Sequence, residues 1–459
     1  MLGNRNDTIV APATPPGEGG VAVIRISGSA TEALLHRVFS PVASVETLVS
    51  HHLYYGFVCS PAGAAIDEVM AVLMRAPHSF TREDVAEIHC HGGPVLVSRI
   101  LDLLVDAGAR LAQPGEFTLR AFLNGRLDLT RAEAVIDLIQ ARSTAAGNLA
   151  FRQLSGTLSQ ALYGFRDTLV EVLAELEAWI DFPDDVPPVS SLDRFQTIVG
   201  GVTDQVDRLL ANFAAGRALR EGVSLLLLGP PNVGKSSLLN ILLGESRAIV
   251  TDIPGTTRDT IEEPLILGGV PLRVIDTAGI RESDNPIESE GVRRTLDKIA
   301  GADLVLVVFD GSREPGPYDR QALELVAGKP ALLVINKADL GTLPVPAAWR
   351  HIPSVTISTH TGYGLDELRD CILKNIHGGS VTLADSSESV LVSDRRHREA
   401  LVRCREALTR FLGDVELNRE FEFLALELRE ALAALGEITG ETTPDQVLEQ
   451  IFSRFCIGK

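Results

Sequence analysis

The sequence predicts a multidomain fold of α/β and all-α parts: an N-terminal α+β domain, a helical domain, and a phosphate-binding α/β domain inserted into the helical one. Three patterns support this prediction. Short apolar runs typical of strands fill the first quarter of the chain, and apolar residues at helical spacing occupy two later stretches. Between those stretches, a glycine-rich motif follows an apolar run and precedes a helix-like segment.

The order of these patterns predicts the domain boundaries. A length of 459 residues is typical of roughly two to four domains. Helical spacing stops near residue 220 and resumes near residue 394, which indicates one interrupted helical domain or, alternatively, two separate helical units. We predict an N-terminal domain at 1–125, a helical domain at 126–220 and 379–459, and an inserted domain at 221–378 with a mostly parallel sheet.

Composition excludes several classes of protein. The formal net charge of −19 argues against indiscriminate binding to nucleic acid, although it is compatible with a local basic groove. No apolar run approaches the ~18 residues of a spanning helix, and the N-terminus carries no secretory signal. The five cysteines are scattered without a C-x-x-C pair, which is typical of reduced thiols. We therefore expect a cytoplasmic protein without membrane contact.

The N-terminal domain contains two candidate polar sites. Strands are predicted at residues 8–10, 21–26, 68–74 and 85–90, and a helix at 94–107. Arg25 closes an otherwise apolar strand, so it is either solvated or in contact with an anionic ligand. His89 and His91 share one strand face with Glu87, a pattern compatible with a metal site, a polar pocket wall or plain packing.

The helical domain shows capping and breaking signals. Thr130 and Glu133 form a capping-box pattern at the start of its first helix. A further helix is predicted at 192–219, and three more between residues 394 and 455, with breaks near Gly413 and Gly440. Apolar residues then lead to Cys456, which predicts a docked tail whose thiol is either packed or nucleophilic.

The glycine-rich motif points to phosphate binding. Gly229–Ser237 reads G-P-P-N-V-G-K-S-S and follows the apolar run Val223–Leu228. In this strand–loop–helix context, the loop amides and the helix N-terminus bind phosphate groups. Lys235 is expected to reach the β- and γ-phosphates, and the Ser236 hydroxyl to ligate Mg²⁺.

Two later tetrapeptides specify the nucleotide. Asp276–Gly279 reads D-T-A-G after an apolar run, which places its carboxylate at a strand end suited to Mg²⁺. Asn336–Asp339 reads N-K-A-D after another such run, and the Asp339 carboxylate can accept hydrogen bonds from guanine N1–H and N2–H₂. Adenine lacks this pair of donors. The three motifs therefore predict a guanine-nucleotide domain with GTP as substrate.

The residue that orients the attacking water is not obvious. Ras-like GTPases carry a glutamine after D-x-x-G, whereas this chain has Ile280 there. The following stretch offers three carboxylates instead: Asp284, Glu288 and Glu290. No cis arginine finger is evident, so the missing positive charge comes from an arginine or a bound cation. Thr256 or Thr257 is expected to be the switch threonine near Mg²⁺.

Taken together, these features resemble the MnmE (TrmE) family of tRNA uridine-modification GTPases over essentially the whole chain. The most specific segments are D-T-I-V-A-P-A-T-P-P-G-E-G-G at 7–20, P-G-E-F-T-L-R-A-F-L-N-G-R-L-D-L at 114–129, I-D-F-P at 180–183, T-D-I-P-G-T-T-R-D at 251–259 and C-I-G-K at 456–459. Few other families combine a GTPase with such flanks.

The resemblance implies an N-terminal domain similar to folate-binding aminomethyltransferase folds, which dimerises and holds a one-carbon (5-formyl- or methylene-) tetrahydrofolate. Arg25, Glu87 and Lys459 match folate-contacting positions of the family. Arg126 matches a fourth position, at which the family often has lysine; arginine keeps the charge but changes the geometry. Cys456 matches a cysteine that the family uses in or near the modification step, and we predict it to be catalytic.

For the GTPase domain, the resemblance implies a monovalent cation where an arginine finger otherwise inserts. The matching K⁺ ligands are Asn232, Thr251, Ile253 (through its carbonyl) and Thr256. Glu288 matches the water-orienting glutamate, Lys235 acts on the phosphates, and Thr257 joins Ser236 at Mg²⁺. The expected GTP-binding residues are Asn232, Val233, Gly234, Lys235, Ser236, Ser237, Thr251, Asp252, Ile253, Pro254, Gly255, Thr256, Thr257, Asp276, Thr277, Ala278, Gly279, Asn336, Lys337, Ala338, Asp339, Ser358, Thr359 and His360.

The family acts with a flavoprotein partner, MnmG, on the wobble uridine (position 34) of certain tRNAs. Together they install an aminomethyl or carboxymethylaminomethyl group at C5, with the folate as the one-carbon donor and FAD and NADH contributed by the partner. The alternative is a ribosome-assembly GTPase that binds rRNA as a switch. Such a protein is expected to carry RNA-binding appendages in place of a folate-like domain and a C-I-G-K tail.

Overall fold

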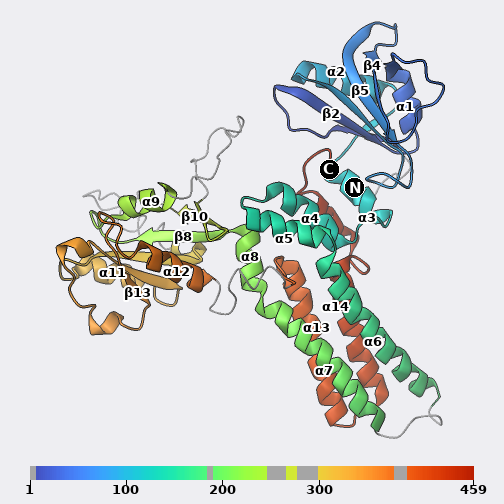
Figure 1. Cartoon of the computed structure of the whole chain (residues 1–459). Coiled ribbons are helices and arrows are strands. Elements are labelled where there is room, and N and C mark those ends of the chain that lie inside the picture. The colour runs from blue at the N-terminus through green and yellow to red at the C-terminus, as the bar shows by residue number, and fades with distance from the viewer. Residues whose placement is uncertain (1–6, 183–189, 245–264, 276–297, 377–389) are drawn as a thin grey trace, which may run out of the picture. The chain divides into compact units, whose positions relative to one another are not determined.

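The structure is a computed structural model that describes residues 7–182, 190–244, 265–275, 298–376 and 390–459 (Figure 1). Contacts divide the chain into two compact units, which we describe separately. The first comprises 1–136, 154–162 and 433–459, and the second comprises 137–153 and 163–432. This division does not define the four domain ranges expected from the sequence, which stay a prediction.

A seven-stranded sheet forms the centre of the first unit, in the order β3-β4-β5-β6-β2-β1-β7. Its strands are β1 (Ile9–Pro12), β2 (Gly19–Ser27), β3 (Phe39–Pro41), β4 (Leu53–Cys59), β5 (Ala65–Met74), β6 (Val85–Gly92) and β7 (Arg110–Leu111). Neighbours are antiparallel except β1 and β7. Helices α1 (Thr31–Val38) and α2 (Pro94–Asp106) share one apolar core with the sheet, in which Leu35, Ile100 and Ile24 are fully buried.

A small helical layer completes the first unit. It contains α3 (Glu116–Leu123), the start of α4 (Leu129–Gln140) and α15 (Asp445–Phe452). Leu119, Leu129 and Phe452 pack in one apolar core, which brings the last helix of the chain against two helices more than 300 residues earlier. The C-terminal tail is therefore docked, as predicted.

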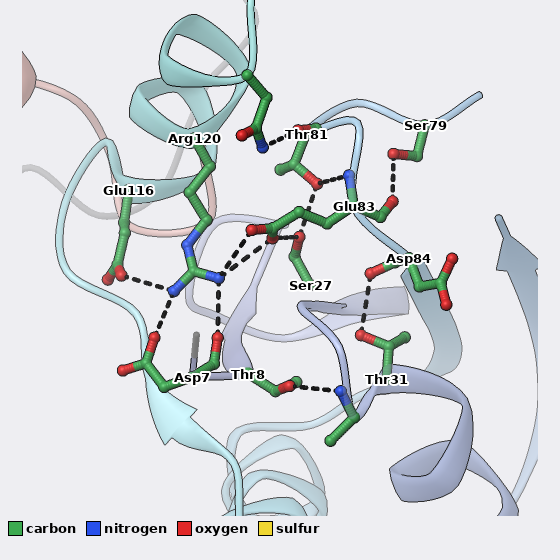
Figure 2. Close-up of polar contacts among 12 residues, drawn as sticks. Asp7, Thr8, Ser27, Thr31, Ser79, Thr81, Glu83, Asp84, Glu116 and Arg120 are labelled. Atoms are coloured by element: carbon green, nitrogen blue, oxygen red, sulfur yellow. Dashed lines mark hydrogen bonds and ion pairs between the residues drawn. The ribbon is translucent and has the colours of Figure 1, made fainter. Parts of the chain in front are cut away.

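One buried guanidinium joins three segments of this unit. Arg120 donates to Asp7 Oδ1 at 2.7 Å, to Glu83 Oε2 at 3.1 Å and to Glu116 Oε1 at 3.2 Å, and only 8% of its side chain is exposed (Figure 2). Glu83 also accepts a hydrogen bond from Ser27 Oγ at 2.7 Å. These contacts tie the chain before β1, the loop before β6 and helix α3 to β2.

Two carboxylates of this network, Asp7 and Glu116, have a lowered pKa. Burial alone would raise the pKa of Asp7 and of Glu116, but hydrogen bonds from Arg110, together with Arg120, outweigh burial and lower both pKa values. Arg110 lies 2.6 Å from both Asp7 Oδ2 and Glu116 Oε1. The folded unit therefore gains stability from these carboxylates near neutral pH and loses it as the pH falls through their lowered pKa values.

The second unit contains a six-stranded sheet in the order β13-β12-β11-β8-β10-β9. The strands are β8 (Val223–Leu228), β9 (Leu265–Leu267), β10 (Val270–Ile275), β11 (Leu304–Asp310), β12 (Ala331–Asn336) and β13 (Ser354–Thr356). Only the β9–β10 pair is antiparallel among the described strands of this sheet. The predicted mostly parallel sheet is confirmed. Leu225 and Leu226 of β8 belong to two different apolar cores, so the sheet is buried on both faces and the strand is continuously apolar.

Helices surround this sheet and form a bundle beside it within the second unit (Figure 1). The sheet carries α9 (Lys235–Gly244), α11 (Pro317–Leu325), α12 (Leu365–Ile376) and the 3₁₀ turns η2 (Ala338–Leu340) and η3 (Ala347–Trp349). The bundle helices are α5 (Thr144–Leu154), α6 (Thr157–Asp181), α7 (Ser190–Ala211), α8 (Phe213–Glu221), α13 (Arg395–Glu416) and α14 (Phe421–Thr439). Trp179 of α6 packs against Phe195 of α7 and Phe421 of α14, with ring centroids 5.0 and 5.5 Å apart.

Three sequence predictions about helix ends are wrong. The helix predicted at 192–219 is two helices, α7 and α8, which are separated at Asn212. Gly413 lies inside α13, and the chain turns instead at Asn418, which adopts φ 51°. Asp128, not Thr130, caps α4, because its carboxylate accepts from Arg131 N at 3.0 Å. The break near Gly440 is confirmed.

A partly buried ion triad lies where the chain enters and leaves the predicted inserted range. Arg220 of α8 donates to Asp137 Oδ1 at 2.8 Å and also binds Asp394 Oδ2. Asp394 caps α13 by accepting from Arg396 N at 2.7 Å. Burial alone would raise the pKa of Asp394, but the charges of His397 and Arg220 lower it to about 2.

None of the described helices combines the length and the hydropathy that crossing a bilayer requires.

We expect Arg120→Ala to lower the local free energy of opening around α3 by ~3 kcal/mol or more, because three partly or fully buried carboxylates lose a common partner. Hydrogen–deuterium exchange of the α3 and β1 amides in the full chain measures this free energy. Arg99→Ala, on an exposed position of α2, is the control and should change it by less than ~0.5 kcal/mol. Equal protection in the two variants would contradict the role of Arg120.

Candidate functional site

The predicted phosphate loop has the required geometry. It connects the end of β8 to the first residue of α9, Lys235. A Cβ on Gly229 would lie 2.3 Å from Val308 O, so a larger residue there requires a backbone shift. A Cβ on Gly234 would lie 2.2 Å from Asn336 Nδ2, and its φ of 98° strains any residue other than glycine. Amides of such a loop and of the helix start are free to bind phosphate oxygens.

The polar residues of the loop and of the helix start after it have defined positions. Lys235 Nζ donates to the carbonyl oxygens of Gly229 and Pro230, each at 2.6 Å, which holds its ammonium group over the loop. Asn232 is exposed and adopts φ 61°, a conformation that asparagine tolerates better than most residues. Ser236 and Ser237 are exposed in the first turn of α9.

The N-K-A-D residues lie directly beside this loop. Asn336 ends β12, is fully buried, and donates through Nδ2 to Val233 O at 2.8 Å. Its Oδ1 accepts from Thr359 N at 3.0 Å. Asn336 therefore joins the phosphate loop to the predicted guanine-binding segment Ser358–His360, as parallel strands that end at one sheet edge allow.

The other two polar residues of the motif are held by separate partners. Asp339 Oδ1 accepts from Ser358 Oγ at 2.6 Å, and this hydrogen bond lowers the pKa of the exposed Asp339 carboxylate. Lys337 Nζ donates to Asp310 Oδ2 at 2.7 Å. Asp310 was not predicted from the sequence, although an acidic residue at the end of the apolar strand β11 is a usable signal.

The remaining predicted nucleotide residues lie outside the described residues. They are Thr251, Asp252, Ile253, Pro254, Gly255, Thr256, Thr257, Asp276, Thr277, Ala278, Gly279 and Glu288. Their roles in binding GTP, Mg²⁺ and K⁺ and in orienting water stay predictions.

The first unit brings together the residues predicted to contact folate. Arg25 of β2 and Glu87 of β6 are opposite each other in the sheet, and Arg25 Nε donates to Glu87 Oε1 at 2.8 Å. The Arg25 guanidinium lies 5.4 Å from the ring centre of Phe80, and the Arg126 guanidinium lies 4.7 Å from the same ring. Arg126 Nη1 also donates to Phe80 O at 2.8 Å. Phe80 was missed at the sequence level because nothing in its local pattern distinguishes it from a core phenylalanine.

The C-terminal tail reaches this group of residues. Arg25 Nη1 donates to Gly458 O at 3.3 Å. Gly458 is buried with φ 89°, and a Cβ there would lie 2.1 Å from Pro12 O, so only glycine fits. Burial, followed by the positive charge of Arg25, lowers the pKa of Lys459. Cys456 is exposed, which excludes the packed-thiol interpretation.

The histidines of β6 do not form a metal site. His91 Nδ1 lies 2.7 Å from Asp67 Oδ1, while His89 Nε2 lies 3.5 Å from Glu87 Oε2. Cys90 points into the apolar core, where burial raises its pKa to about 11. In the part of the chain that the structure describes, no group of three His, Cys, Asp or Glu side chains could hold a metal ion.

Comparison with known proteins shows the family of the chain. Residues 8–126 match the model of the GTP-binding protein TrmE N-terminus, and residues 129–456 match the model of the MnmE helical domain. The chain belongs to the MnmE family. The tRNA modification GTPase MnmE of Syntrophotalea carbinolica is 54% identical over 455 residues, and that of Geobacter metallireducens is 51% identical over 456 residues. Each alignment covers 99% of both chains.

Solved structures add a weaker likeness. The G domain of the FeoB iron transporter of T. maritima is 29% identical over 33% of this chain and 98% of its own, with a TM-score of 0.26. The assignment to the MnmE family of GTPases rests on the family models and the full-length relatives.

We expect Asp339→Asn to shift nucleotide preference from GTP toward xanthosine triphosphate. Xanthine carries a carbonyl at C2 in place of the guanine amino group, and an amide can donate to it where a carboxylate cannot. GTP affinity should fall ~10- to 100-fold. Titration calorimetry with the two nucleotides checks this, with Asp370→Asn on an exposed position of α12 as control. An unchanged preference would remove Asp339 from the guanine site.

Proposed function

We propose that this chain couples K⁺-dependent GTP hydrolysis to modification of the wobble uridine (U34) of certain tRNAs. As a member of the MnmE family, it is a GTPase with a role in tRNA modification. In the finer proposal, it works as a homodimer with a flavoprotein of the MnmG type. Together they convert C5 of the uridine to an aminomethyl or carboxymethylaminomethyl form, using a one-carbon tetrahydrofolate.

One observation carries the one-carbon part of this proposal. The C-terminal tail binds Arg25 through Gly458 O, so Lys459 lies near the Arg25–Glu87 pair, and Cys456 precedes Gly458 by two residues. Transfer of a one-carbon unit requires that the bound donor and the reactive residue lie close together. The arrangement supports a donor at Arg25 and Glu87 with the exposed Cys456 thiol beside it.

The residues present fit a tetrahydrofolate. Glu87 uses Oε1 for Arg25, and its Oε2 can accept N–H groups of a pterin. Phe80 offers an aromatic ring for stacking a flat heterocycle, and Lys459, Arg25 and Arg126 provide positive charge for the ligand's carboxylates. When bound, the folate supplies the one-carbon unit.

The GTP site fits the expected ions as far as the described residues extend. Ser236 and Asn232 are exposed beside the phosphate loop, with oxygen atoms of the kind that Mg²⁺ and K⁺ accept. The proposal assigns Thr257 to Mg²⁺ as well, Thr251, Ile253 and Thr256 to K⁺, and Glu288 to the attacking water. When bound, K⁺ supplies positive charge to the phosphates in place of an arginine finger. The ribosome-assembly alternative does not account for the match of residues 8–126.

The hydrolysis part of the proposal is tested by measuring GTP turnover in K⁺ and in Na⁺, and by replacing Glu288. GTP turnover should be at least ~10-fold faster in K⁺ than in Na⁺. Glu288→Ala should lower turnover ~100-fold or more while GTP affinity stays unchanged, because general-base or water-orienting groups act on the chemical step. Glu290→Ala is the matched control. Equal rates in the two salts would exclude the cation, and normal turnover of the Glu288 variant would exclude its role.

The modification part is tested in cells. A strain without this chain should lose the C5-modified wobble nucleoside, measured by mass spectrometry of its tRNA. Reintroducing the chain should restore it, whereas Arg25→Ala should not, since the variant lacks the residue that holds both Glu87 and the tail. Arg99→Ala should restore it fully. Restoration by Arg25→Ala would argue against the one-carbon site.

A further inference from the structure

The first unit contains a cluster of arginines that no carboxylate neutralises. Several arginines of this unit form ion pairs, for example Arg75 with Glu32 at 2.6 Å. By contrast, Arg82, Arg126 and Arg131 donate only to main-chain carbonyl oxygens and contact no carboxylate among the residues that the structure describes. These carbonyls are Asn124 O at 3.0 Å, Phe80 O at 2.8 Å and Leu154 O at 2.9 Å, respectively.

Arg82 lies near the residue before Arg126, and Arg126 lies next to Arg25. Arg131 is near enough for its charge to act on Arg126. Arg82 Nη1 lies 3.5 Å from the position that a Cβ on Gly125 would take, directly before Arg126. Arg126 and Arg25 stack on the same Phe80 ring. Burial first, and then the positive charges of Arg131, Arg82 and Arg25, lower the pKa of Arg126.

This concentration of charge is unfavourable without an anion. Two carboxylates near these arginines in the sequence are bound elsewhere: Glu83 to Arg120 and Ser27, and Asp128 to the N-terminus of α4. In a chain of net charge −19, an uncompensated cationic cluster indicates a site for a polyanionic ligand. Arginine forks match carboxylates in a bidentate manner, and several forks suit a ligand with several carboxylates.

We propose that Arg82, Arg126 and Arg131 bind the γ-linked oligoglutamate tail of the folate, so that the chain selects polyglutamylated tetrahydrofolates. This inference rests on the proposed folate site at Arg25. The position of the cluster favours this ligand over tRNA phosphates, because Arg126 shares the Phe80 ring with Arg25, which places the cluster next to the folate rather than on a separate surface.

Titration calorimetry of the full chain with two probes tests the proposal: 5-formyltetrahydrofolate carrying one glutamate or five. The pentaglutamate should bind ~10-fold more tightly at low salt. Charge-assisted contacts between arginine and carboxylate can raise the affinity by about that factor when salt does not screen them. Arg82→Gln and Arg131→Gln should each reduce this advantage ~3-fold or more, with the affinity for the monoglutamate changed by less than ~2-fold. Arg82→Lys keeps the charge and should retain most of the advantage.

Arg99→Gln on α2 is the matched control and should leave both affinities unchanged. Circular dichroism melting of each variant verifies that it folds. If one of the two glutamine variants does not fold, the other still tests the proposal. Equal affinities of the two probes for the unmodified chain would overturn the tail site while leaving the folate site intact. Absence of binding by either probe would remove both. Variants that lose tRNA affinity in filter binding, with the pentaglutamate advantage unchanged, would reassign the cluster to RNA.

Discussion

The Arg120 guanidinium is the interaction on which the first unit depends. Its partners come from the segment before β1, the loop before β6 and the start of α3, so a single side chain fixes three segments that are distant in the sequence. Removal of Arg120 would leave Asp7 and Glu116 paired with Arg110, whereas Glu83 would lose its arginine partner inside a partly buried site. The same loop carries Phe80, whose position against Arg25 follows from the anchoring of Glu83.

In the second unit, the constraint is the shared edge of a parallel sheet. The strands β8, β11 and β12 end at that edge: the phosphate loop follows β8, and Asp310 and Asn336 are the last residues of β11 and β12. The phosphate loop and the end of β12 lie so close together that a methyl group on Gly234 would collide with the Asn336 amide. Asn336 is fully buried and bonds both Val233 and Thr359, so the segments predicted to bind the phosphates and the base are held together at one junction.

Local sequence patterns predicted those elements of the fold whose structure depends on neighbouring residues in the chain. The strand β8 and the motifs after β8 and β12 are short runs with a fixed spacing, and their structures agree with the prediction. The strand β4 was missed because its residues, L-Y-Y-G-F-V-C, show no alternation of apolar and polar side chains. Phe80 and the carbonyl of Gly458 could not be predicted as site features, since both act through tertiary contacts with Arg25. Thr130 was predicted as the cap of α4, but the cap is Asp128, two residues earlier. Its carboxylate accepts from the Arg131 amide and from the Thr130 hydroxyl.

The ion triad at Arg220 has a consequence for the architecture of the chain. Arg220 pairs with both Asp137 and Asp394. The residue directly before the predicted inserted range and a residue after it are therefore held at the same place. Leu149 of α5, Leu219 of α8 and Leu391 belong to the same apolar core as Leu225 of β8. A chimera that exchanges the predicted inserted range 221–378 would therefore have to preserve this packing surface as well as the Arg220 ion pairs.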